Sequence, residues 1–126
     1  MTVEADNKGV ADIRERAFKF AVRIVKLCQY LEGTPGASRT MAKQLLRAGT
    51  SIGANLEEAQ GGQSKADFIS KNAIALKEAR ETCYWLNLLV ASEITRRTRT
   101  AELQKEVEEL MRIIGAIIVA AKKSQA

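Results

Sequence analysis

The sequence predicts an all-α protein, an antiparallel up-down four-helix bundle formed by one domain. Apolar residues recur at spacings of three and four in four long segments, and Pro35 and the pair Gly61-Gly62 fall between segments. The 126 residues, 46% of them hydrophobic, suit a single domain that buries roughly two-thirds of its unfolded surface. The connections between segments are short, so successive helices should run antiparallel.

The first two helices are expected at about residues 12–31 and 38–60, with residues 1–11 disordered or frayed. The first stops at the turn Gly33-Thr34-Pro35-Gly36, and the second begins with Ser38 as its N-cap and ends at Gly61-Gly62. The predicted core stripes are Ile13, Ala17, Phe20, Ile24, Leu27 and Leu31 in the first helix, and Met41, Leu45, Ala48, Ile52, Leu56 and Ala59 in the second.

The last two helices are expected at about residues 64–92 and 100–122. Ser64 followed by Asp67 is a variant of the capping box, and residues 95–100 form a polar turn. The fourth helix has a near-heptad apolar register. The predicted core stripes are Phe68, Ala75, Ala79, Cys83, Leu86 and Val90 in the third helix, and Leu103, Val107, Leu110, Ile114, Ile117 and Ala121 in the fourth.

Composition argues against several classes of protein. Histidine is absent, and Cys28 and Cys83 lie inside apolar patterns without a CxxC spacing, so we expect structural thiols and no metal or cofactor. No apolar run is long enough to span a membrane, and the first ten residues have neither a secretory signal nor a transit-peptide pattern. These features predict a cytoplasmic protein that does not contact membranes.

Apolar residues extend beyond the core stripes. Such surface favours burial against another copy of the chain, although scattered exposed apolar residues are the simpler alternative. The residues expected at an oligomer interface are Phe18, Val22 and Val25 in the first helix and Ile74, Trp85 and Leu88 in the third.

Polar residues along the second helix predict a side-chain network and no catalysis. Ser51, Asn55 and Glu58 share one flank and are expected to meet Asn72 of the third helix. Ser51 has no histidine to activate it, and no phosphate-binding loop is present, so no catalytic residue is assigned. Gly49 and Gly53 in the same helix indicate close helix approach.

Basic residues concentrate in the first part of the chain. Residues 14–47 hold eight Lys or Arg against two acidic residues, a net +6, while the whole chain has +5. Spacings of three and four place them on helix faces, where they can follow phosphates, although an ordinary solvated face would look the same. With 5% aromatic residues, any binding should depend on charge or shape. The candidate nucleic-acid-binding residues are Arg16, Lys19, Arg23 and Lys26, followed by Tyr30, and Arg39, Lys43 and Arg47.

Two segments, LLRAGTSIGANLEEA at 45–59 and ADFISKNAIALKEARETCYWLNLL at 66–89, make the chain resemble the 23S rRNA intervening-sequence proteins. The resemblance implies a four-helix bundle that assembles into a homopentameric ring without known catalysis. A similar bundle is the accessory variability protein of diversity-generating retroelements, which works with a reverse transcriptase and RNA. The resemblance is carried by Gly49, Thr50, Ser51, Ile52, Gly53, Ala54, Asn55, Glu58 and Ala59, and by Phe68, Lys71, Ala75, Lys77, Glu78, Glu81, Thr82, Trp85 and Leu86.

Residue chemistry and resemblance together predict a non-catalytic oligomeric adaptor that binds RNA or another nucleic acid through the basic surface of the first two helices. The alternative is a scaffold that docks a protein partner, such as a reverse transcriptase, without touching nucleic acid.

Overall fold

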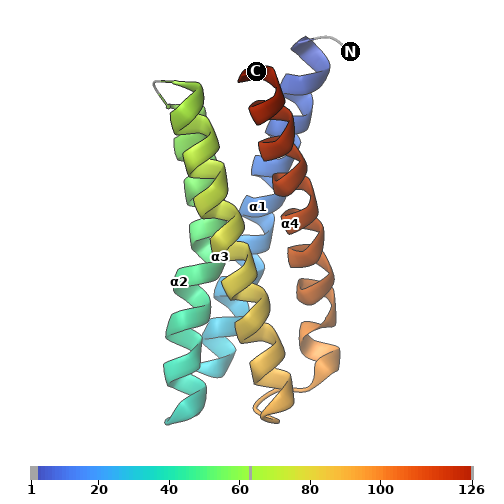
Figure 1. Ribbon diagram of the computed structural model, residues 1–126. Helices are drawn as coiled ribbons and strands as arrows, with labels where there is room; N and C mark the ends of the chain where they lie inside the picture. The colour runs from blue at the N-terminus through green and yellow to red at the C-terminus, as the bar shows by residue number, and fades with distance from the viewer. Residues whose placement is uncertain (1–2, 63, 126) are drawn as a thin grey trace.

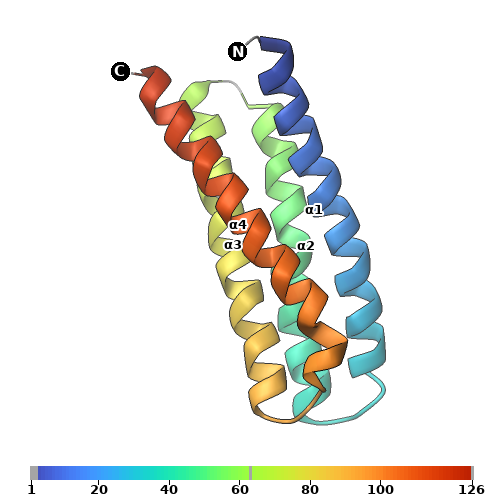
Figure 2. The same cartoon turned by 90° about the vertical axis from the view of Figure 1, so that its right-hand side faces the viewer.

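Four long helices make up the bundle in the computed structural model, which describes residues 3–62 and 64–125. Each helix packs against its neighbour in the chain, and α1 also packs against α4, which closes the ring of contacts. The helices run alternately up and down (Figures 1 and 2). Their bounds are Val3–Leu31 for α1, Ala37–Gln60 for α2, Lys65–Ala91 for α3 and Arg97–Gln125 for α4.

The two ends of the bundle differ. One end contains the α1–α2 turn, residues 32–36, and the α3–α4 turn, residues 92–96, and we call it the closed end. The opposite end contains the α2–α3 connection and the last residues of α4 (Figure 1). Residues far apart in the sequence, those near 30, 40 and 97, therefore meet at the closed end.

Two helices are longer than expected. Helix α1 begins at Val3, so residues 3–11, expected to be disordered or frayed, are helical. A single glycine in this segment costs only about 1 kcal/mol, which does not end a helix. Helix α4 begins at Arg97, inside the segment expected to be a polar turn, because arginine is a good helix former.

One of the two predicted caps is correct. Ser64 has an extended backbone, and its hydroxyl accepts a hydrogen bond from the Asp67 amide at 3.1 Å, as expected of an N-cap. Ser38 is not the cap of α2, which begins after Gly36, at φ 95°. The Ser38 hydroxyl instead donates to the carbonyl of Leu31 at 2.7 Å, so it satisfies the end of α1. A glycine that tolerates positive φ allows this tighter turn.

The core agrees with the predicted stripes in α1 and α2, where every predicted residue except the half-buried Met41 is buried. In α3, Phe68, Cys83 and Val90 are only half-buried. In α4 the predicted Ile117 and Ala121 are only half-buried, and Ile118 is the buried residue in their place. A straight helix drifts by about 20° per heptad, and this drift moves the buried face to the next residue.

Gly49 permits the closest approach between helices. A Cβ atom built on Gly49 would lie 2.8 Å from Cγ2 of Ile24, closer than real side chains approach. Gly53 is less demanding, since a Cβ there would lie 3.6 Å from Ala17. The interpretation of Gly49 as a packing glycine is therefore confirmed, and α1 and α2 are held in contact through it.

Candidate nucleic-acid interface

The basic stripe of α1 faces carboxylates of α4. The Arg16 guanidinium donates to both oxygens of Glu106, from Nε at 3.1 Å and from Nη2 at 2.7 Å. This hydrogen bond raises the pKa of Arg16 above its ordinary value. About two turns further along α1, Arg23 forms a longer and more exposed ion pair with Glu102, at 3.5 Å. Both arginines line a groove of about 440 Å³ between α1 and α4, together with acidic side chains.

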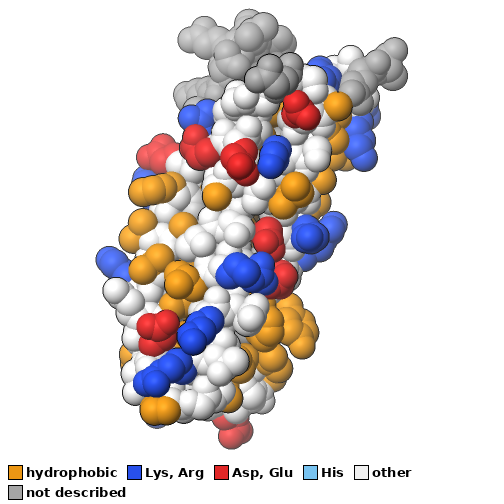
Figure 3. Space-filling view, turned by 90° about the vertical axis from the view of Figure 1, so that its left-hand side faces the viewer, with side chains coloured by type: hydrophobic (Ala, Val, Ile, Leu, Met, Phe, Trp, Pro, Cys, Tyr) orange, Lys and Arg blue, Asp and Glu red, His pale blue; other side chains and the backbone are white. Residues whose placement is uncertain are grey.

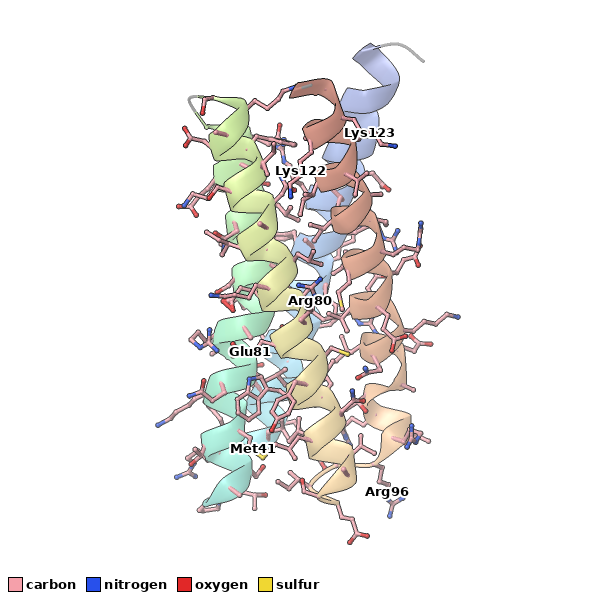
Figure 4. All side chains as sticks on the ribbon, in the orientation of Figure 1. Met41, Arg80, Glu81, Arg96, Lys122 and Lys123 are labelled. Carbon is pink, nitrogen blue, oxygen red and sulfur yellow. The ribbon has the colours of Figure 1, made fainter. Side chains whose placement is uncertain are left out.

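Arg47 on α2 is also neutralised by a neighbouring helix. Its guanidinium donates to both Glu78 oxygens at 3.3 and 3.4 Å and contacts Glu81 as well. Glu78 is buried, and Glu81 accepts a hydrogen bond from the indole of Trp85 at 3.1 Å. Figure 4 shows Glu81 on the side of α3 that faces α2. We call Arg16, Arg23 and Arg47 the seam arginines, because each crosses to a carboxylate on a neighbouring helix.

The remaining predicted cations keep their charge available. Lys19 pairs with Glu15 of its own helix at 3.0 Å, an exposed contact that contributes little. Lys26 and Lys43 are exposed and have no carboxylate within 4.0 Å among the described residues. Arg39 donates from Nε to the carbonyl of Glu32 at 3.2 Å, and this contact leaves its charge uncompensated.

Sequence reasoning missed a further group of cations, which lies at the closed end of the bundle. Arg96, Arg97 and Arg99 lie at the α3–α4 turn and the start of α4, and Figure 4 shows Arg96 at the closed end. The Arg99 guanidinium stacks 3.7 Å from the ring centroid of Tyr30, and this cation–π contact joins α4 to the end of α1. The signal was the run TRRTRT at residues 95–100, three arginines within four positions.

Six cations thus lie within about two helical turns of the closed end. We call them the closed-end cations: Lys26, Arg39, Lys43, Arg96, Arg97 and Arg99. None of them has a carboxylate within ion-pair distance in the described part of the chain. Two acidic residues, Glu32 and Glu93, lie in the adjoining turns.

The residues expected at an oligomer interface differ in exposure. Phe18 is 69% exposed, and Val22, Val25 and Ile74 are between 37% and 40% exposed. Trp85 and Leu88 are half-buried, and Trp85 packs against the core. On the face shown in Figure 3, hydrophobic side chains form several separate groups among charged ones. Phe18 is therefore the most prominent apolar side chain on the surface of α1.

The four side chains predicted to form a polar network between the second and third helices make separate contacts. Ser51, Asn55 and Asn72 donate to carbonyls of their own helices, at 2.6, 2.8 and 2.9 Å. Short polar side chains in a helix commonly bond to the carbonyl of the preceding turn, and these three donor groups are used in that way. Glu58 alone of the four reaches across, with an ion pair to Lys71 at 3.5 Å.

The two cysteines are free thiols. Cys28 is buried, its thiol donates to the carbonyl of Ala42 at 3.3 Å, and burial raises its pKa to about 12. Cys83 is half-buried and accepts a hydrogen bond from Gln104 at 3.0 Å. Within residues 3–62 and 64–125, no group of three or more metal-ligating side chains comes together. None of the helices in those ranges is long and apolar enough to cross a membrane.

Comparison with known proteins identifies the family. Residues 11–116 match the family model described as 23S rRNA-intervening sequence protein. The chain is 44% identical, with a TM-score of 0.79, to a Bacteroides thetaiotaomicron VPI-5482 protein of unknown function from the S23 ribosomal protein family. The match covers 84% of this chain and 97% of that one. No curated protein matches, and the likeness to retroelement accessory proteins stays a prediction. The chain belongs to the 23S rRNA-intervening sequence protein family.

Proposed function

We propose that this protein is a non-catalytic adaptor that self-assembles and binds RNA through its closed end. The observation that carries the proposal is the group of six closed-end cations, none of which is neutralised by a carboxylate in the described chain. The sequence predicted a binding site along the length of α1 and α2. We place it instead at one end of the bundle, because the seam arginines form ion pairs with carboxylates.

Phosphate groups are well suited to these cations. Each neutralised phosphate releases condensed counterions, so affinity grows with the number of contacts and falls with salt. Arginine also presents a planar fork that donates two parallel hydrogen bonds to a phosphate. Two exposed aromatic rings, Tyr30 and Tyr84, lie within about two turns of this end in the described part of the chain, and Arg99 already stacks on Tyr30, so stacking surface for bases is limited. Recognition would therefore depend on backbone charge and RNA shape.

Self-assembly would repeat the closed end around an axis and multiply its contacts. The exposed stripe Phe18, Val22 and Val25 on α1 supports association with a second copy, since apolar side chains that gather on one exposed helix face commonly mark an interaction site. A pentameric ring is the assembly that the family resemblance implies. Multiple copies bound to one RNA would raise affinity without any new contact within the monomer.

The test is binding of a structured RNA across a salt series, measured by fluorescence anisotropy. A triple variant, Lys26→Gln, Lys43→Gln and Arg96→Gln, should lower the slope of log affinity against log salt by about 2 to 3 units per protomer. The matched control, Lys77→Gln, Lys122→Gln and Lys123→Gln, removes the same charge elsewhere. Lys122 and Lys123 lie at the opposite end of the bundle (Figure 4).

Equal losses in both triple variants would show that net charge, and not the closed end, controls binding. No binding even at low salt would contradict the RNA proposal and favour the alternative, a scaffold for a protein partner. Self-assembly is tested separately by native mass: the wild type should exceed the mass of one chain, and Phe18→Glu should reduce it. A monomeric wild type at micromolar concentration would contradict this part of the proposal.

A further inference from the structure

We propose that the hollow beside the α3–α4 turn is a phosphate-binding pocket. The hollow has a volume of about 650 Å³ and is lined on one side by Tyr30 of α1 and on the other by the α3–α4 turn and the start of α4. The inference rests on the proposed function for the source of the phosphate, which is an RNA. The chemistry of the pocket, however, can be tested with phosphate alone.

Arginine is the most frequent charged residue around this hollow. Arg96, Arg97 and Arg99 all line it, and Glu93 is the single carboxylate in its lining. Arg99 is already held on the ring of Tyr30, so part of the conformational entropy of ordering that side chain is lost before any ligand arrives. A tetrahedral phosphate offers several acceptor oxygens to such a group of donors.

The start of α4 lacks the compensation that helices usually carry. Its first turn contains no acidic residue, although the amide groups there form the positive end of the helix dipole; the Arg99 amide already donates to the carbonyl of Arg96 at 3.0 Å. Arg97 and Arg99 add positive charge at the same place. Cations near a helix N-terminus are unfavourable unless an anion binds beside them, and a bound phosphate would satisfy both the amides and the arginines.

Thr95 supplies the independent observation. It lines the hollow, is only 8% exposed, and is held in the turn by an amide hydrogen bond to the carbonyl of Leu89 at 3.3 Å. Its hydroxyl oxygen is the one buried side-chain nitrogen or oxygen atom without a hydrogen-bond partner in the described part of the chain. An unpaired buried hydroxyl is costly, and a phosphate oxygen that reaches Thr95 after a small opening of the turn would remove that cost.

The experiment titrates the protein into inorganic phosphate and follows the ³¹P NMR line width at constant ionic strength, set with chloride. The wild type should broaden the signal saturably. Thr95→Val, which keeps the side-chain shape but removes the hydroxyl, and Arg97→Gln should each weaken binding about tenfold, the size expected for one hydrogen bond to a charged group. Thr95→Ser, which keeps a hydroxyl, should bind within about twofold of the wild type.

The matched control is Lys77→Gln, which removes one charge from the exposed surface of α3, does not line the hollow and is not one of the closed-end cations. Its phosphate affinity should stay within about twofold of the wild type. A loss as large as that of Arg97→Gln would overturn the pocket, as would the absence of saturable broadening by the wild type. Thermal melting of Thr95→Val, followed by circular dichroism, tests for a folding defect. If the variant melts like the wild type, its loss of phosphate binding arises at the pocket.

The two proposals fail in different ways. Saturable phosphate binding that depends on Thr95, combined with no binding of structured RNA, would keep the pocket and refute the RNA function. RNA binding that depends on the closed-end cations but is unchanged by Thr95→Val would keep the function and refute the pocket.

A short oligoribonucleotide made with and without a 5′-phosphate then separates the two sources of phosphate in RNA. Tighter binding of the phosphorylated form indicates the terminus, and equal binding indicates the backbone.

Discussion

The seam arginines and the closed-end cations are chemically alike but have different surroundings. Arg16, Arg23 and Arg47 each meet a carboxylate of a neighbouring helix. Lys26, Lys43 and Arg97, by contrast, have no carboxylate within 4.0 Å among the described residues. Spacing on one helix therefore does not tell a structural cation from a binding one. What decides the role is the residue that faces it from the next helix.

The largest difference should appear in stability. Arg47→Ala leaves the buried Glu78 carboxylate without its main partner and should lower the free energy of unfolding by about 1 to 3 kcal/mol, less than for a fully buried pair because Arg47 is half-exposed. Arg97→Ala should cost almost nothing. Urea denaturation at one fixed protein concentration compares the two, and equal costs would remove the distinction between the two groups of cations.

The second effect concerns a buried group at the closed end, the Cys28 thiol. Its pKa of about 12 in the folded protein lies above the ordinary value of 9.0. The buried thiol therefore contributes fully to the free energy of unfolding below pH 9. This contribution is lost as the pH rises toward 12, because the unfolded chain releases the proton first. At pH 10 the loss should be about 1 kcal/mol. Denaturation of Cys28→Ala between pH 8 and 10 should show a correspondingly smaller decline. Cys83→Ala controls for the removal of a thiol, and identical declines in all three proteins would contradict the expectation.

A seam arginine should become a binding residue when its partner is removed. Glu102→Gln releases Arg23, which lies on the same face of α1 as Lys26, and should tighten RNA binding about twofold to fivefold. Glu108→Gln, also on α4, removes the same charge without releasing an ion-paired arginine in the described chain. Anisotropy at one salt concentration distinguishes the two variants. An equal gain from Glu108→Gln would mean that only net charge matters.

The smallest effect has opposite signs for stability and binding. Arg97→Glu places a carboxylate at the positive end of the α4 dipole and should raise the free energy of unfolding by about 0.3 to 1 kcal/mol. The same change should weaken binding of RNA and of phosphate. Denaturation and binding are measured on one preparation, with Arg97→Gln as the neutral intermediate. Destabilisation by Arg97→Glu would indicate that Arg97 supports the fold.

Much of the fold could be predicted because the residues that begin and end helices, and the spacing of apolar residues, are local properties of the sequence. The core positions of α1, the N-cap at Ser64 and the packing role of Gly49 all follow from neighbours within about one turn or from the size of one side chain. The cap at Ser38 could not be predicted, because its hydroxyl bonds to Leu31 across the turn, and Gly36 made that turn possible.

The candidate site was less predictable than the fold. The sequence by itself determined four amphipathic helices, the order in which they pack and the excess of basic residues, since each depends on residue type and spacing along one chain. Only the tertiary structure decided which cations are neutralised and which remain available. Ion pairs such as Arg16 with Glu106 join residues ninety positions apart. Their formation depends on the relative register of packed helices, and packing across the whole bundle sets that register.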